Sequence, residues 1–273
     1  MNITKQHIET AIKAALAAGS EILDVYSQPI AVELKDDKSP LTLADKRSHL
    51  KIMAGLESAG FPVLSEEGKQ MDFEQRSAWN PFWLVDPLDG TKEFIKRNGE
   101  FTVNIALIKD HYPVMGIIYV PVLSELYFAS EGMGSYKCEN IKPDDSLFSE
   151  NDFLETLIKK SIRLNDVIRP SRYSVVASRS HMTAETEQLI NGLKAEHGEI
   201  DLVSKGSSLK LCLVAEGKAH IYPRLAPTME WDTAAGQAIA ELAGCTVINY
   251  EDKTRMRYNK ENLLNPWFVV ASN

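Results

Sequence analysis

The sequence is poor in cysteine and has no long apolar stretch. Its three cysteines, Cys138, Cys212 and Cys245, form no Cys-x-x-Cys pair and are too few and odd in number for a disulfide framework. They predict free thiols in a reducing, cytoplasmic compartment. No apolar run approaches the roughly 20 residues of a membrane-spanning helix, so we expect no integral membrane segment.

Basic residues are also too few for a general nucleic-acid binder. The chain carries 30 Lys and Arg against 38 Asp and Glu, which gives a formal net charge of −8. Affinity for a nucleic-acid backbone comes mostly from clustered Lys and Arg, so this balance argues against such a partner. An anionic substrate would have to be held locally, by a few basic residues or by metal ions.

The sequence contains alternating helical and strand-like segments. The first 26 residues place apolar side chains on one helical face and predict an amphipathic, core-facing helix. A second helix is predicted to follow Pro40 and to end near Gly60. Four of its apolar side chains are expected to face inward: Leu43, Leu50, Met53 and Leu56.

The later segments predict a layered α/β protein in two parts. Residues 101–138 are rich in β-forming runs separated by turn residues and predict an antiparallel sheet. From residue 171 onwards, strands and helices alternate, which predicts sandwich layers. We therefore predict an N-terminal α+β domain over 1–145, a linker with one short helix over 146–170, and a C-terminal α/β domain over 171–273.

The segment "WLVDPLDGTKEF" holds two aspartates at the end of a predicted buried strand. A proline stiffens the backbone between Asp86 and Asp89, so both carboxylates and the carbonyl of Leu88 can point to one place. Magnesium prefers such hard oxygen ligands. Gly90 permits close backbone approach, and a helix starting near Thr91 would present free N–H groups to an anion. The alternative interpretation is a β-turn capped by an aspartate.

Two further acidic clusters lie at similar positions. Glu66 follows a short strand in "FPVLSEEG", and Asp232 opens an alanine-rich helix in "MEWDTAAG". Alone they would be a solvated turn and a helix N-cap. Buried carboxylates repel one another, whereas divalent cations neutralise them, so three such clusters together favour a two-metal phosphoryl-transfer site. The chain lacks the Asp-x-Asp, EF-hand, Walker, Gly-x-Ser-x-Gly and His-Glu-x-x-His motifs of other chemistries.

The motifs "DPLDGT" and "WDTAAG", with the upstream Glu-Glu pair, resemble the lithium-sensitive, magnesium-dependent phosphomonoesterases typified by inositol monophosphatase. Within this family the chain is most similar to the CysQ-type 3'(2'),5'-bisphosphate nucleotidases. That similarity rests on "KDDKSPLTLAD", "PVLSEE" and "GSSLKLCLVAEGKAHIYPR", and on Lys92-Glu93-Phe94 where inositol phosphatases have Thr-Asn-Phe. The resemblance implies the sugar-phosphatase fold, an inositol monophosphatase-like αβαβα sandwich with the site between its halves.

The resemblance also assigns residues. It implies metal ligation by four carboxylates and one carbonyl oxygen: Glu66, Asp86, Leu88, Asp89 and Asp232. It implies that Thr91, with Asp37, orients and deprotonates the attacking water. For substrate binding it implies a larger set: Glu66, Leu88, Asp89, Gly90, Thr91, His181, Ser207, Lys210, Arg224 and Asp232. The alternative interpretation of Lys210 and Arg224 is that they are surface residues without a binding role. The alternative for His181 is a position beside a helix cap.

The implied activity is hydrolysis of adenosine 3',5'-bisphosphate to AMP and phosphate, by in-line attack of a water activated by two or three Mg²⁺ ions. Li⁺ is expected to inhibit by replacing one of them. An inositol or sugar phosphate phosphatase is the alternative, because the carboxylates alone do not select a phosphomonoester. A nucleotide-binding sensor without catalysis would have lost Thr91 or a metal ligand, and the chain has lost none. The sequence does not distinguish a monomer from a homodimer. It also leaves open contact of the protein with the cytoplasmic face of the inner membrane.

Overall fold

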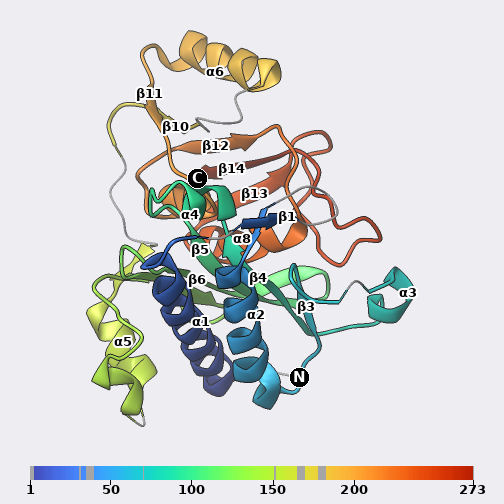
Figure 1. The fold of residues 1–273 in the computed structure, drawn as a ribbon. Coiled ribbons are helices and arrows are strands. Elements are labelled where there is room, and N and C mark those ends of the chain that lie inside the picture. The colour runs from blue at the N-terminus through green and yellow to red at the C-terminus, as the bar shows by residue number, and fades with distance from the viewer. Residues whose placement is uncertain are drawn as a thin grey trace.

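The protein is built as a stack of alternating helical and sheet layers. The computed structural model describes the chain in these stretches: 3–30, 32–34, 40–69, 71–150, 152–164, 170–177 and 183–272. Figure 1 shows a helical layer, a seven-stranded sheet, a second helical layer, a five-stranded sheet and an outer helix. This order confirms the predicted αβαβα sandwich.

Two N-terminal helices, α1 (Lys5–Tyr26) and α2 (Leu43–Leu56), cover one face of the larger sheet. The apolar stripe of α1 faces inward as predicted, because its apolar side chains recur at helical spacing. α2 starts after Thr42, whose side chain and backbone N–H both contact Asp45 in a capping box. The two helices and the sheet enclose the first hydrophobic core.

The predicted inner face of α2 is wrong. Three of the four side chains expected to face inward are exposed: Leu43 (51%), Leu50 (68%) and Met53 (36%). Only Leu56 is buried. The inner face instead carries the polar residues Asp45 and Ser48, both almost inaccessible to solvent. They face inward because the Ser48 hydroxyl donates to the Pro87 carbonyl at 2.6 Å and Asp45 accepts the Thr91 hydroxyl at 3.2 Å.

The strands of the larger sheet lie in chain order. Its strands are β3 (Val63–Ser65), β4 (Phe82–Asp89), β5 (Thr102–Lys109), β6 (Tyr112–Val120), β7 (Glu125–Ser130), β8 (Gly134–Cys138) and β9 (Ile162–Arg163). β3 and β4 are parallel, and every later pair is antiparallel, as the β-rich pattern over 101–138 predicts.

A register shift interrupts the pairing of β4 with β5. Asp86 lies opposite Asn104, and Asp89 lies opposite Thr102. Three steps along β4 therefore match two along β5, which is the geometry of a β-bulge. Bulges redirect side chains, and here the bulge contains the proline of "DPLDGT".

The second half of the chain supplies the remaining layers. α7 (Leu209–Ala215) and α8 (Glu230–Leu242) pack between the two sheets in a second core. The smaller sheet has the order β11 (Asp201–Val203), β10 (Ser174–Val176), β12 (Ile221–Arg224), β14 (Phe268–Ser272) and β13 (Cys245–Asn249). The outer helix α6 (Ala184–His197) covers it through a small third core of Val175, Ala177 and Ile190.

The segment assigned to a linker carries ordered structure over most of its length. η2 (Ser146–Ser149) and α5 (Phe153–Lys160) precede β9, which pairs with β8. Phe153 and Leu157 belong to the first core, so this part packs with the N-terminal half. Residues 165–169 lie outside the described residues. The division into two domains at 145 and 171 stays a prediction.

Short elements complete the described chain: β1 (Val32–Leu34), β2 (Pro40–Thr42), η1 (Glu57–Ala59), α3 (Phe73–Arg76) and α4 (Thr91–Ile95). β1 and β2 form a small antiparallel pair. Among the described residues, no helix combines the length and apolar character needed to cross a membrane.

Candidate functional site

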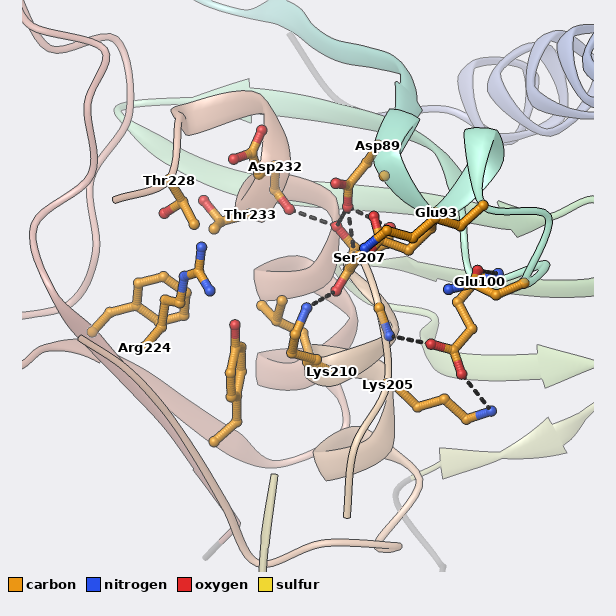
Figure 2. A pocket seen from close by; sticks show the side chains of 18 residues that line it. Asp89, Glu93, Glu100, Lys205, Ser207, Lys210, Arg224, Thr228, Asp232 and Thr233 are labelled. Carbon is orange, nitrogen blue, oxygen red and sulfur yellow. Dashed lines mark hydrogen bonds and ion pairs between the residues drawn. The ribbon is translucent and has the colours of Figure 1, made fainter. Parts of the chain in front are cut away.

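A cavity of about 600 Å³ lies between the two halves of the chain. Asp89 and Asp232 reach it from the end of β4 and the first turn of α8. Lys210 and Arg224 reach it from α7 and β12. In the view of Figure 2, the two aspartates lie above the two cationic side chains. The cavity therefore combines acidic and basic groups from segments far apart in the sequence.

The parallel pairing of β3 and β4 places Glu66 beside the end of β4. The backbone N–H of Glu66 donates to the carbonyl of Val85 at 3.1 Å, immediately before Asp86. The Asp86 carboxylate is buried and accepts the N–H of Leu88 at 3.0 Å. The carboxyl ends of two neighbouring strands thus deliver Glu66, Asp86 and Asp89 to one region, as the sequence pattern predicted.

Burial and mutual repulsion act on these carboxylates. Loss of hydration raises the pKa of Asp86, and the nearby charges of Glu66, Asp89 and Asp232 raise it further. Burial, followed by the charge of Asp89, likewise raises the pKa of Asp232. Hard oxygen donors that repel one another in a buried place fit a divalent cation such as Mg²⁺. In the stretches described, no three acidic, histidine or cysteine side chains already converge into a metal cage.

Asp89 is held by donors from the segment that precedes α7. Its Oδ2 atom accepts the Ser208 N–H at 2.6 Å, the Ser208 hydroxyl at 2.7 Å and the Ser207 hydroxyl at 2.5 Å. Ser207, which the resemblance places on the substrate side, thus directs its hydroxyl to Asp89. A cation that binds through Oδ2 has to compete with the two hydroxyl donors on this oxygen.

Asp232 lies inside the first turn of α8 and not at its N-cap. Its Oδ2 accepts the backbone N–H of Met229 at 2.9 Å, which satisfies one free donor at the helix start. The residues Ala234 and Ala235 that follow are buried, and their small size lets this turn pack closely. The carbonyl oxygen of Asp232 accepts the Ser208 hydroxyl at 2.6 Å, so Ser208 links Asp232 to Asp89.

Thr91 is the first residue of α4, and it follows Gly90 in a left-handed conformation with φ 92°. A Cβ atom at Gly90 would lie 3.2 Å from the carbonyl of Glu100, so the turn requires glycine. The Thr91 hydroxyl lies 3.2 Å from Asp45 Oδ1 and 3.4 Å from the Leu88 carbonyl. This turn therefore connects Thr91 with both the predicted metal ligands and α2.

Asp45 is the residue that sequence reasoning missed. It is 1% exposed, and its Oδ2 accepts the N–H and hydroxyl of Thr42 at 2.7 and 2.6 Å. Its other oxygen accepts the Thr91 hydroxyl. The sequence feature that could have identified Asp45 is its spacing from Thr42 in "LTLAD", which is the spacing of a capping box. Asp37 and His181 lie outside the described residues.

The basic side of the cavity is partly desolvated. Lys210 is 8% exposed, and its amine donates to the Ser207 carbonyl at 2.9 Å. Burial lowers the pKa of Lys210 to about 8. Arg224 donates to the Pro227 carbonyl at 2.9 Å, while its buried Nε has no hydrogen-bond partner among the described residues. These two groups provide the local cations that an acidic protein needs to hold an anion.

Known proteins resemble this chain in sequence and fold over nearly its whole length. The chain is 44% identical to the 3'(2'),5'-bisphosphate nucleotidase CysQ of Salmonella typhimurium over 97% of its length and 99% of that protein. It is 55% identical to a solved structure of CysQ from Bacteroides thetaiotaomicron, with a TM-score of 0.90, covering 98% of this chain and 97% of that one.

A more distant structure shares the fold alone. An IMPase/NADP phosphatase solved with Mg²⁺ and phosphate is 18% identical, with a TM-score of 0.69, over 93% of this chain and 86% of that one. The sequence model of the inositol monophosphatase family matches residues 4–273. The chain thus belongs to the inositol monophosphatase family.

Proposed function

We propose that the protein is a magnesium-dependent 3'(2'),5'-bisphosphate nucleotidase, which hydrolyses adenosine 3',5'-bisphosphate to AMP and phosphate. The observation that carries the proposal is the single cavity in which Asp89 and Asp232 lie opposite Lys210 and Arg224. A substrate with two phosphates matches a site with two kinds of phosphate partner. Relatives that cover the whole chain and bear the name of this activity support the same conclusion.

The acidic side is assigned to the phosphate that is cleaved. Glu66, Asp86, Asp89 and Asp232, with the Leu88 carbonyl, supply oxygen donors suited to two or three Mg²⁺ ions. When bound, Mg²⁺ makes a water more acidic and neutralises phosphate charge. Without such a cation these carboxylates would repel the phosphate.

Thr91 and Asp45 are proposed to handle the proton of the attacking water. The Thr91 hydroxyl has one hydrogen, and Asp45 Oδ1 accepts it at 3.2 Å. The lone pairs of Thr91 are then free to accept a proton from a water while its own proton passes to Asp45. Two donors from Thr42 hold Asp45 Oδ2, so the carboxylate keeps its orientation. This assigns to Asp45 the role that the resemblance gave to Asp37.

The basic side is assigned to the second phosphate, which stays on the product. Lys210 and Arg224 would pair with the 5'-phosphate, and Tyr222 lies beneath Lys210 with its ring centre 5.9 Å from the amine. Ser207 and Gly90 line the same cavity. His181 is proposed to contribute to the same part of the site.

Phosphate release with Mg²⁺ tests the proposal most directly. Adenosine 3',5'-bisphosphate and inositol 1-phosphate are compared at equal concentrations, and we expect a clear preference for the nucleotide. A preference for inositol 1-phosphate would move the assignment to an inositol or sugar phosphate phosphatase. The Asp89→Asn variant is expected to fold and to lose most turnover with either substrate.

Lithium provides a separate test of the metal site. We expect millimolar Li⁺ to inhibit hydrolysis and the inhibition to weaken as Mg²⁺ is raised, because both ions would compete for one position. Activity that ignores Li⁺ would contradict the lithium assignment and leave the hydrolase assignment standing.

The cysteines bear on where the enzyme works. Cys138, Cys212 and Cys245 are all buried thiols. We propose a cytoplasmic enzyme, since buried thiols of this kind persist in a reducing compartment.

A further inference from the structure

A chain of buried polar groups lies behind Asp89. Thr102 and Asn104 extend from β5, opposite the bulge of β4, and are 0% and 1% exposed. Ser207 and Ser208 extend toward them from the segment before α7. Such groups are costly in a protein interior unless every donor and acceptor has a partner.

The contacts of Thr102 fix the orientation of the Asn104 amide. The Thr102 hydroxyl donates to Asn104 Oδ1 at 2.8 Å. Asn104 Nδ2 then faces Ser208 and donates to its hydroxyl oxygen at 2.9 Å. Ser208 accepts from Asn104 and therefore keeps its own hydrogen for another acceptor.

Both serine hydroxyls have one hydrogen and two acceptors. Ser208 Oγ lies 2.7 Å from Asp89 Oδ2 and 2.6 Å from the Asp232 carbonyl oxygen. Ser207 Oγ lies 2.5 Å from Asp89 Oδ2 and 2.7 Å from Thr102 Oγ1. Because Thr102 gives its hydrogen to Asn104, it can accept from Ser207. Each serine can thus turn from Asp89 to a second acceptor already within hydrogen-bond distance.

We propose that Thr102 and Asn104 are positioning residues that allow Ser207 and Ser208 to release Asp89 to a divalent cation. When Asp89 Oδ2 binds the cation, the Ser207 hydrogen turns to Thr102 Oγ1 and the Ser208 hydrogen turns to the Asp232 carbonyl. No hydroxyl hydrogen is then left without an acceptor. The inference rests on the proposed function, because it takes Asp89 as a metal ligand.

Thr102→Val tests the inference, because valine keeps the shape and strand preference of threonine and removes the hydroxyl. In this variant Ser207 keeps only Asp89 of its two acceptors and competes with the cation. We expect calorimetric Mn²⁺ binding to weaken about three- to tenfold, the range of one hydrogen bond. The Mg²⁺ concentration for half-maximal phosphate release rises by the same factor, with an unchanged maximal rate at saturating Mg²⁺.

Two control variants separate the hydroxyl from packing. Thr102→Ser keeps the hydroxyl and is expected to retain Mn²⁺ affinity to within about twofold, well under the loss of one hydrogen bond. Ser130→Ala removes a buried hydroxyl on β7 of the same sheet that has no hydrogen-bond partner within the described stretches, and is expected to leave Mn²⁺ affinity unchanged. Far-ultraviolet circular dichroism and thermal unfolding verify the fold of each variant.

A double-mutant cycle with Ser207→Ala establishes the route of the effect. If Thr102 acts by accepting from Ser207, Thr102→Val has no further effect on Mn²⁺ affinity when Ser207 is alanine. An equal loss in both backgrounds would mean that Thr102 does not act by accepting from Ser207, and would overturn the inference. So would a Thr102→Val variant that unfolds at lower temperature but binds Mn²⁺ like the wild type.

Asp89→Asn distinguishes failure of the inference from failure of the proposed function. If Asp89→Asn bound Mn²⁺ with wild-type affinity, Asp89 would not be a metal ligand. Both the inference and the metal site of the proposed function would then be overturned. Loss of Mn²⁺ binding in Asp89→Asn with unchanged binding in Thr102→Val would overturn the positioning role and leave the metal site intact.

Discussion

Asp45 is a buried carboxylate whose two oxygens serve different purposes. Oδ2 caps the start of α2 through Thr42, and Oδ1 accepts the hydroxyl of Thr91 across the site. The capping contacts fix the side chain, so the oxygen that faces Thr91 cannot turn away without losing two hydrogen bonds. A residue that a sequence pattern assigns to helix capping is thereby suited to accept a proton.

We predict that Asp45→Asn lowers the maximal rate of phosphate release by at least about a hundredfold, the lower range for a general base. The amide keeps the shape and an acceptor oxygen but cannot take a proton. Asp37→Asn provides the matched comparison and is expected to retain near-normal rates. If instead Asp37→Asn loses the rate and Asp45→Asn keeps it, Asp37 is the proton acceptor, as the resemblance implied.

The second prediction concerns Lys210 and the pH dependence of kcat/KM. Burial lowers its pKa from 10.5 to about 8, so the amine loses its charge as pH rises through about 8. In the proposed function the charged form pairs with the second phosphate, and that attraction is fully present below this pH. We expect kcat/KM for adenosine 3',5'-bisphosphate to fall toward about tenfold per pH unit above it.

Two comparisons check the origin of this pH dependence. Adenosine 3'-monophosphate has no second phosphate, and its kcat/KM is expected to lack the fall above pH 8 that Lys210 causes. Lys210→Gln is expected to bind the bisphosphate weakly at every pH. A fall of equal size with both substrates would assign the titration to another group.

At the scale of elements, the sequence predicted the strands and their order better than the orientation of α2. β3 and β4 carry apolar residues followed directly by acids, so the position of Glu66, Asp86 and Asp89 could be foreseen. Apolar periodicity selected the wrong face of α2, because its inner face includes Asp45 and Ser48. A buried carboxylate that bonds to another element breaks the apolar pattern from which the inner face is read.

Other features depended on contacts that no local pattern encodes. The Ser208 hydroxyl bonds to Asp89 and Asp232, which lie more than a hundred residues and 24 residues away along the chain. The segment 146–164 looked polar enough for a linker, yet Phe153 and Leu157 anchor it in the first core. Contacts between segments that are distant in the sequence determine both the bonding of Ser208 and the packing of residues 146–164. Composition does not reveal either.

The packing of α8 on β6 gives a third prediction. A Cβ atom at Gly116 would lie 2.3 Å from the Ala235 carbonyl oxygen and 2.8 Å from the Ala238 Cβ atom. Since α8 also carries Asp232, this close approach sets the height above the sheet of the turn that holds this proposed metal ligand. We predict that Gly116→Ala destabilises the fold by about 1 to 3 kcal/mol, the usual cost of overpacking.

Gly192→Ala is the matched control for Gly116→Ala. Gly192 lies in α6, and a Cβ atom there would meet nothing within 4 Å. Because alanine favours a helix over glycine, we expect unchanged or slightly greater stability, up to about 1 kcal/mol. Chemical denaturation measures both variants. Equal stability for the two would contradict the close packing of α8.

At the scale of the whole molecule, the site exists only where the two halves meet. Asp89 comes from the sheet of the first half, whereas Asp232, Lys210 and Arg224 come from the second. α8 packs between both sheets, and its first turn lines the cavity through Asp232 and Thr233. Contacts that hold the halves together away from the cavity should therefore stabilise the fold without taking part in catalysis.

Lys137 makes such a contact. Its amine is buried on β8 and lies 3.0 Å from Glu125, 3.0 Å from Glu139 and 3.2 Å from Glu216. Glu216 follows α7 in the second half, and its side chain is 7% exposed. The three carboxylates raise the pKa of Lys137 against the opposing effect of burial, so the amine stays charged.

We predict that Lys137→Met destabilises the protein by about 3 kcal/mol, because it removes a cation from the buried Glu216 carboxylate and leaves it only Lys218 and Tyr127 among the described residues. The matched control is Lys46→Met, which removes an exposed pair with Glu33 and should cost less than about 1 kcal/mol. Lys137 does not line the cavity, so kcat and KM below the unfolding temperature should match the wild type. Because α8 packs on both sheets, thermal unfolding should remain one transition, shifted downward by about 5 to 10 °C. Two separate transitions in Lys137→Met would instead show that the halves unfold independently.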